Sequence, residues 1–311
     1  MHININRHLF AVYWGLFSSG YDLMDKGDPF IRRICDRIGQ AAVPPSVASY
    51  FALARTGGEG ANPYYPRGSD LSAACFFQQK TLEEYIEFLS FCGSPSLHDP
   101  GFLPWILSLP PLLRIIEEKA GFESLFQEYR QEALTRFACV NAAMEEITGV
   151  LKDNGLYQDV FLCFAPNLLQ SPYLVDYALA DNTLYIIGAV FSRTAVLHEY
   201  LHLLLHDRKA FFLQMAGEKE LSHFADAALL RRLGYLPDDS LSSRAHALED
   251  CFIRSLSGVL VGEKSAGDYV RTQKELGFVI LPELMERLRS LRRGERGLDA
   301  FLQQFEQLSA D

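Results

Sequence analysis

The residues with the clearest capacity for chemistry are His198, Glu199 and His202, which form an HExxH pattern with Tyr200 and Leu201 between them. Residues four apart lie on the same face of an α-helix, so the two imidazoles can approach a single metal ion. Zinc favours such nitrogen ligands, and a catalytic zinc site leaves one position for water. Glu199 lies about 100° round the helix from His198, beside the metal, where a carboxylate can accept a proton from the bound water. The pattern therefore predicts metal-assisted hydrolysis with zinc as the cofactor, His198 and His202 as ligands, and Glu199 as the catalytic base.

The residues around this pattern are apolar: Ala195 to Leu197 precede it and Leu203 to Leu205 follow it. A helix that is apolar nearly all round is buried. Two histidines and a glutamate are costly to bury there unless they are paired or bind a metal. The alternative interpretation is that the histidines are hydrogen-bonded in a core or face solvent, and the apolar context favours the metal over it.

His206 extends the pattern by one further helical turn. A third ligand from the same unbroken helix lies too far along the axis to reach the same ion, so we expect a structural or supporting role for His206. The metzincin pattern instead breaks the helix with Gly and places its third His ten positions after the first. That position, 208, is Arg in this chain. The metzincin family is therefore excluded.

The third ligand must come from elsewhere, and the best candidate segment is 244–254, which contains His246, Glu249 and Asp250. Glu249 follows His202 by 47 positions and has apolar neighbours on the helix expected there. An acid in an apolar helix needs a partner or a ligand. We expect Glu249 to be the metal ligand. Asp250 and His246 stay open as alternatives, and so does an ion pair between a surface Glu249 and a nearby arginine.

With this downstream acid the chain resembles the gluzincins, the zinc metallopeptidases in which HExxH pairs with a Glu on a later helix. The resemblance implies Glu249 as the third ligand, and it implies that an acid close to it, here Asp250, orients a zinc-bound His. The thermolysin-like pattern has Asn before the ligand Glu and Ser-Asp after it at fixed spacing, whereas this chain has Leu248, Phe252 and Ile253 at those positions. The chain is therefore similar to divergent bacterial metallopeptidases rather than to thermolysin.

The resemblance covers about residues 183–260 and implies a peptide or protein substrate. The strand expected over 183–189 resembles the zincin edge strand, whose backbone binds an extended peptide by strand addition. Attack on the substrate carbonyl also requires a group that stabilises its developing charge. Tyr269, His246 and Arg244 are candidates for this role, and no spacing rule selects among them.

Two other functions are compatible with the same residues. A catalytically inactive zincin-fold protein could bind a peptide or partner through its helical N-terminal half, although such a protein has no catalytic use for Glu199. A metal-dependent hydrolase of non-peptide amides is the other alternative, because HExxH specifies water activation and not the acyl group.

The expected elements give an α+β, mostly helical fold. Asp28 and Pro29 predict a helix start, and a long helical stretch is expected over 122–152. Three short strands are expected over 159–164, 172–180 and 183–189, the last two joined by a tight turn at Asp181 and Asn182. The motif helix then runs from Ser192 or Arg193 to Asp207. We therefore predict a zincin-like small antiparallel sheet plus the active-site helix, flanked by helical N- and C-terminal regions.

This order divides the chain into a helical N-terminal region, 1–155, and a zincin-like catalytic region, 156–311, whose second half is helical. Residues 57–68 are rich in Gly, Pro, Asn and Tyr and are expected to form a loop, either a lid over the cleft or a plain connection.

Composition narrows the class of partner. The chain has 311 residues, 49% of them hydrophobic, which is enough for a substantial core. Its net charge of -10 argues against nucleic acid and anionic membranes as partners, because both bind basic patches.

The apolar stretch 9–17 is too short to span a bilayer and is expected to be a core segment. Six cysteines without a CxxC pair are typical of buried free thiols in a reducing compartment, so we expect a cytoplasmic protein, and no oligomeric state is predicted.

Overall fold

The computed structural model describes residues 2–55, 68–77, 82–92, 94–233, 235–291 and 295–308. The chain forms two compact units, Met1–Met144 with Val160–Phe191 and Glu145–Asp159 with Ser192–Asp311. The three strands belong to the first unit and the motif helix belongs to the second. The predicted division into functional regions 1–155 and 156–311 stays a prediction. The predicted lid or connection at 57–68 lies, apart from its last residue, outside the described residues.

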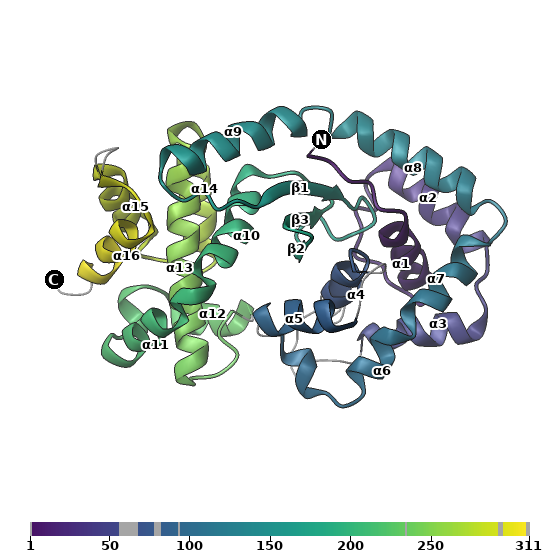
Figure 1. Cartoon of the computed structure of the whole chain (residues 1–311), viewed down its shortest axis with the longest axis horizontal. Helices are drawn as coiled ribbons and strands as arrows, with labels where there is room; N and C mark the ends of the chain where they lie inside the picture. Colours follow the sequence, from purple (N-terminus) through teal and green to yellow (C-terminus); the bar gives the residue numbers. More distant parts are fainter. Residues whose placement is uncertain are drawn as a thin grey trace. The chain divides into compact units, whose positions relative to one another are not determined.

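Most of the described chain is helical, and it includes one three-stranded sheet, which confirms the α+β, mostly helical class (Figure 1). The helices of the first unit are α1 (Arg7–Ser18), α2 (Pro29–Gln40), α3 (Pro45–Ala52), α4 (Gly68–Ala74), α5 (Leu82–Cys92), α6 (Phe102–Leu107), α7 (Leu109–Glu117) and α8 (Phe122–Arg136). Helix α9 (Val140–Asp153) begins in the first unit and ends in the second. The second unit continues with α10 (Arg193–Leu205), α11 (Lys209–Glu218), α12 (Ala227–Leu233), α13 (Leu241–Val261), α14 (Glu263–Glu275), α15 (Leu281–Ser290) and α16 (Leu298–Gln307).

The sheet is mixed rather than antiparallel, which corrects the prediction. Its strands are β1 (Phe161–Pro166), β2 (Val175–Ala180) and β3 (Thr183–Gly188), in the order β1-β3-β2. Strands β2 and β3 form the predicted antiparallel hairpin, and Asp181 and Asn182 adopt φ of 49° and 55° in its turn. Strand β1 pairs with β3 in parallel. The turn residues determine the hairpin locally, whereas the direction of β1 depends on a pairing between distant segments that residue types do not encode.

Strand β3 lies in the interior of the sheet, as Figure 1 shows. It is paired along its length with β1 on one side and with β2 on the other. The prediction that 183–189 form an edge strand open to a peptide is therefore wrong, because both backbone edges are occupied. The outer edge of β1 is also partnered: the Asn4 amide donates to the Phe164 carbonyl at 2.9 Å, and the Phe164 amide donates to the His2 carbonyl at 2.8 Å.

The helix start predicted at Asp28 and Pro29 agrees with the structure, but the single long helix expected over 122–152 does not. The side chain of Asp28 accepts hydrogen bonds from the amides of Phe30 and Ile31 and caps α2. The continuous helix expected over 122–152 is divided into α8 and α9. Phe137 leaves the helical backbone at φ -106°, and its buried ring packs edge-on against Phe164 of β1 at 5.1 Å. A tertiary contact therefore ends α8 where no glycine or proline signals a break.

The apolar stretch 9–17 is the central helix of the first unit, and the prediction of a core segment is confirmed: residues 9–16 of α1 are buried. Helix α1 approaches α3 so closely that a Cβ added to Gly15 would lie 2.2 Å from the ring of Phe51. A side chain at position 15 would push the two helices apart. Across the described ranges, none of the helices combines the length and the apolar character needed to cross a membrane.

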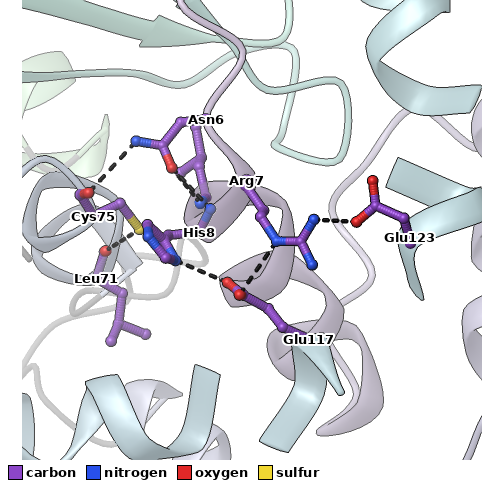
Figure 2. A network of polar contacts seen from close by, with 8 residues as sticks. Asn6, Arg7, His8, Leu71, Cys75, Glu117 and Glu123 are labelled. Carbon is purple, nitrogen blue, oxygen red and sulfur yellow. Dashed lines mark hydrogen bonds and ion pairs between the residues drawn. The ribbon is translucent and has the colours of Figure 1, made fainter. Parts of the chain in front are cut away.

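A polar network joins the start of α1 to α7 and α8 (Figure 2). Asn6 caps α1 by accepting from the amides of His8 and Leu9 at 2.8 and 3.0 Å. Glu117, at the end of α7, contacts Nδ1 of His8 at 2.8 Å and accepts from Nε of Arg7 at 3.2 Å. Arg7 also pairs with Glu123 in the first turn of α8. Arg7 and the two glutamates carry opposite charges, so the network links three helix ends, with the small stabilisation that is usual for partly exposed ion pairs.

All six cysteines are free, and four of them, Cys35, Cys75, Cys163 and Cys251, are buried. Burial raises the pKa of Cys35 to about 11 and that of Cys163 to about 12, and it raises the pKa of the other two still further. Thiols with such pKa values are not nucleophiles at neutral pH. The expectation of buried thiols holds for these four. Cys139 is exposed, and Cys92 is half-buried.

Asp176 of β2 is a buried acid with neutral partners. Its Oδ1 accepts from the Ser69 hydroxyl at 2.5 Å, and its Oδ2 accepts from Nε2 of Gln170 at 2.9 Å. Burial raises the pKa of Asp176 from 3.8 to about 6, and the nearby Asp70 adds to the shift. The folded state therefore holds this proton more tightly than the unfolded chain does. The contribution of Asp176 to the free energy of unfolding falls as pH rises between about 4 and about 6, and it stays low above that range.

We expect Asp176→Asn to stabilise the protein at neutral pH and to have little effect near pH 4. Asparagine keeps an oxygen for Gln170 and an NH₂ group for Ser69, and it needs no proton to be neutral. Thermal or urea unfolding at about pH 7.5 would show a gain of about 1–3 kcal/mol in the free energy of unfolding. Asp36→Asn on the exposed face of α2 is the control. An equal effect of Asp176→Asn at both pH values would contradict the account.

Candidate metal centre

Helix α10 presents the HExxH residues on a buried scaffold. The side chain of Ser192 caps its first turn by accepting from the amide of Ala195 at 3.4 Å. Tyr200 is fully buried, and its hydroxyl donates to the Leu156 carbonyl at 2.9 Å and accepts from the Gln158 amide at 2.6 Å. These bonds tie α10 to the segment that precedes the sheet. The rotation of α10 about its own axis is thereby restrained, and so is the direction in which its histidines point.

Helix α13 supplies the other half of the site. It is the 21-residue helix of the second unit, capped by Ser240, and it packs against α10, α11, α14 and α15 (Figure 1). Most of its residues from Ala245 to Leu260 are buried. His198 of α10 lies beside Asp250, and His202 lies beside Glu249 and His246. The two helices therefore run antiparallel past each other at this point.

Three ligand atoms converge where the helices meet. Nε2 of His198 lies 3.2 Å from Nε2 of His202 and 3.3 Å from Oδ1 of Asp250. One candidate ligand atom from each of the three residues lies within 4.8 Å of the others. Ligand atoms bonded to one tetrahedral zinc ion at 2.0–2.2 Å are separated by about 3.3–3.6 Å. The two separations from Nε2 of His198 are close to this spacing, so the donor types and these two distances are compatible with a zinc ion.

Glu249 lies next to the same imidazole but on its other nitrogen. Its Oε1 is 3.3 Å from Nδ1 of His202, whereas Nε2 of His202 faces His198. A carboxylate at the second nitrogen fixes the tautomer and the orientation of a metal-binding histidine. The structure thus gathers Asp250 with the two histidines and places Glu249 behind His202, the reverse of the roles that the resemblance implies. The identity of the third ligand stays a prediction.

The ionisation of His198 and Asp250 suits a metal, whereas that of His202 opposes it. Burial lowers the pKa of His198 to about 3, so its imidazole is neutral and able to ligate. Burial opposes the charged form of Asp250, but Arg254 and the two histidines outweigh it and lower its pKa to about 2. Burial likewise opposes the charged form of His202, but the hydrogen bond to Glu249 and the charges of Glu199, Asp250 and Glu249 together outweigh it, so the pKa of His202 is raised. The site therefore holds a neutral imidazole from His198, an ionised carboxylate from Asp250, and an imidazole from His202 that must lose its proton to bind a metal.

The ligand atoms are not sealed from solvent. The side chains of His198 and His202 keep 18% and 19% of their exposure, compared with 7% for Asp250. Glu199 is half-buried on α10, and its charge contributes to the raised pKa of His202. Partial exposure of these side chains is compatible with a catalytic zinc site, which keeps an open position, in contrast to a closed structural one.

The remaining predicted residues separate by position. His206 contacts its neighbour Asp207 at 3.2 Å and does not belong to the group of ligand atoms. Among the three candidates for stabilising the substrate carbonyl, the hydroxyl of the largely buried Tyr269 donates to the Arg254 carbonyl at 3.0 Å. Arg244 lies two positions before His246, about 160° away round α13. The exposed ring of His246 is nearly parallel to that of His202 at 6.3 Å, so His246 is the candidate nearest the site.

Arg254 is the residue at this site whose role the sequence did not reveal. Its Nε donates to Oδ2 of Asp250 at 2.8 Å across one helical turn. The sequence carried a signal, because an acid and an arginine four positions apart on an apolar helix are expected to pair. Glu249, one position earlier, offered an equally plausible partner by spacing alone.

No family model, no curated protein and no solved structure matches this chain. What the protein does is therefore inferred from the geometry of the candidate metal centre.

We expect Asp250→Asn to lower zinc affinity more than Glu249→Gln. The first removes the charge of a donor atom, and the second removes a contact behind a ligand, which costs about 10–100-fold in metal affinity. Calorimetric titration of the metal-free protein with zinc measures both, and His206→Gln on the same stretch of chain is the control with unchanged affinity. If Glu249→Gln abolishes binding while Asp250→Asn retains it, Glu249 is the ligand.

Proposed function

We propose that this protein is a zinc-dependent hydrolase of amide bonds, with peptides as the expected substrates. The observation that carries the proposal is the approach of Nε2 of His198, Nε2 of His202 and Oδ1 of Asp250 to one point between α10 and α13. Two imidazoles and a carboxylate are a donor set of catalytic zinc sites.

In this proposal His198, His202 and Asp250 would hold the zinc ion, which would supply the Lewis acidity that makes a water molecule acidic near neutral pH. Glu199 accepts the proton of that water and returns it to the leaving amine. Glu249 keeps Nε2 of His202 directed at the site through its contact with Nδ1. Among the three candidates, the exposed His246 beside His202 is the best placed to donate a hydrogen bond to the substrate carbonyl.

The residues of the site support the type of reaction more strongly than they support a particular class of substrate. Strand addition to β3, which supported a peptide, is not possible because β3 is paired on both sides. Peptides remain the expectation from the HExxH resemblance, and other amides are the alternative substrates. A binding protein without turnover is the alternative function, and the acid at position 199 beside the histidines favours catalysis over it.

We expect Glu199→Gln to retain stoichiometric zinc and to lose hydrolysis by about 100- to 10,000-fold, the usual contribution of a general base. Elemental analysis of purified wild type and variant measures the metal. Cleavage of a diverse peptide library, with and without a chelator, measures the activity, and a library of simple amides extends the search.

The wild type with its zinc removed and then restored is the control, and it should lose and regain activity. A wild type that purifies without zinc and does not take it up would refute the proposed function. A Glu199→Gln variant as active as the wild type would remove Glu199 from the mechanism.

A further inference from the structure

Arg254 is an enclosed cation, and within the described residues its contacts come from the second unit. Its Nε donates to Oδ2 of Asp250 at 2.8 Å, and its Nη1 donates to Oε1 of the buried Gln273 at 2.6 Å. The guanidinium lies over the rings of Phe278 and Tyr235, at 4.7 and 5.1 Å from their centres. Only 13% of the side chain is exposed. Hydrogen bonds in its plane and aromatic rings over its faces leave this guanidinium little freedom to move.

The two oxygens of the Asp250 carboxylate consequently have different partners: one is held by Arg254, and the other is directed at the candidate metal site. Oδ2 accepts from Arg254, and Oδ1 faces Nε2 of His198 at 3.3 Å. A carboxylate whose second oxygen is occupied by an arginine offers a metal one donor atom, in a direction set by that arginine. The planar fork of the guanidinium fixes this direction in a way that the point charge of a lysine does not.

We propose that Arg254 is a positioning residue of the metal centre, which holds Oδ2 of Asp250 so that Oδ1 alone binds the metal. This inference rests on the proposed function, because it takes the metal centre as given. It adds a determinant of metal affinity and coordination number that lies outside the HExxH pattern and outside the ligand set.

Whether metal affinity rises or falls when the guanidinium of Arg254 is removed shows whether Arg254 positions Asp250 or only lies near the metal. A positive charge near a cation site repels the cation, so removing a guanidinium that only stands nearby would raise metal affinity. Removing a guanidinium that positions a ligand would lower it, because Asp250 would lose its fixed direction. A purely structural arginine would change the stability of the fold and leave the affinity of the folded protein unchanged.

The experiment measures zinc affinity for the full-length wild type and for Arg254→Met, Arg254→Lys and a control, Arg231→Met. Arg231 lies on α12 in the same unit, where it pairs with the exposed Asp239. We expect Arg254→Met to lower zinc affinity by about 10–100-fold, Arg254→Lys to give a smaller loss, and Arg231→Met to change nothing. Circular dichroism and thermal unfolding identify variants that are folded.

X-ray absorption of the zinc-loaded proteins measures the number of oxygen ligands of the zinc ion, which does not depend on the stability of the fold. We expect one oxygen of Asp250 in the wild type and an added oxygen in Arg254→Met, where Oδ2 is released. If Arg254→Met does not fold, Gln273→Leu is used in its place, because it removes a restraint on Arg254 and keeps the charge pair. Its expected effect is a several-fold loss of affinity.

Two failures are distinguishable. If the wild type binds no zinc, the proposed function fails. If the wild type binds zinc, and folded Arg254→Met, or Gln273→Leu in its place, binds it equally or more tightly with the same absorption spectrum, Arg254 is not a positioning residue and the metal centre stands without it.

Discussion

Helices α10 and α13 carry polar side chains on otherwise apolar surfaces, and these side chains must pair with one another when the helices pack. An unpaired polar group in such an interior costs about 2–7 kcal/mol. Helix α10 brings two histidines into contact with α13. Helix α13 supplies Glu249 and Asp250 as their partners, and Arg254 as the partner of Asp250. Each of these charges has a named partner, and the partners lie on a face where a few ångströms separate the imidazole nitrogens from a carboxylate oxygen. Helix packing and the proposed metal chemistry therefore depend on the same residues.

The chain of contacts runs outwards from this face. Asp250 is held by Arg254, Arg254 by Gln273 of α14 and by two aromatic rings, and His202 by Glu249. Tyr200 restrains α10 from the opposite side through Leu156 and Gln158. Rigid supports of this kind are what a metal site needs if its ligands are to keep their geometry before the ion arrives.

What the sequence predicted well was local. The cap at Asp28 and the turn at Asp181 and Asn182 depend on neighbours within a few positions, and the structure confirms both. It also brings the imidazoles of His198 and His202 together, as their spacing on one helix predicts. What it could not predict depends on distant segments. Glu249 and Asp250 differ by about 100° round one helix, so choosing between them requires the rotation of α13 against α10. The parallel pairing of β1 with β3 and the break between α8 and α9 at Phe137 are likewise set by tertiary contacts.

The most direct test is an anomalous difference map at the zinc absorption edge, from crystals of the purified protein. The account predicts one strong peak between α10 and α13, bonded to Nε2 of His198, Nε2 of His202 and Oδ1 of Asp250 at about 2.0–2.2 Å. Crystals of zinc-treated protein with no peak at this position, or with the two imidazoles turned away from each other, would contradict it.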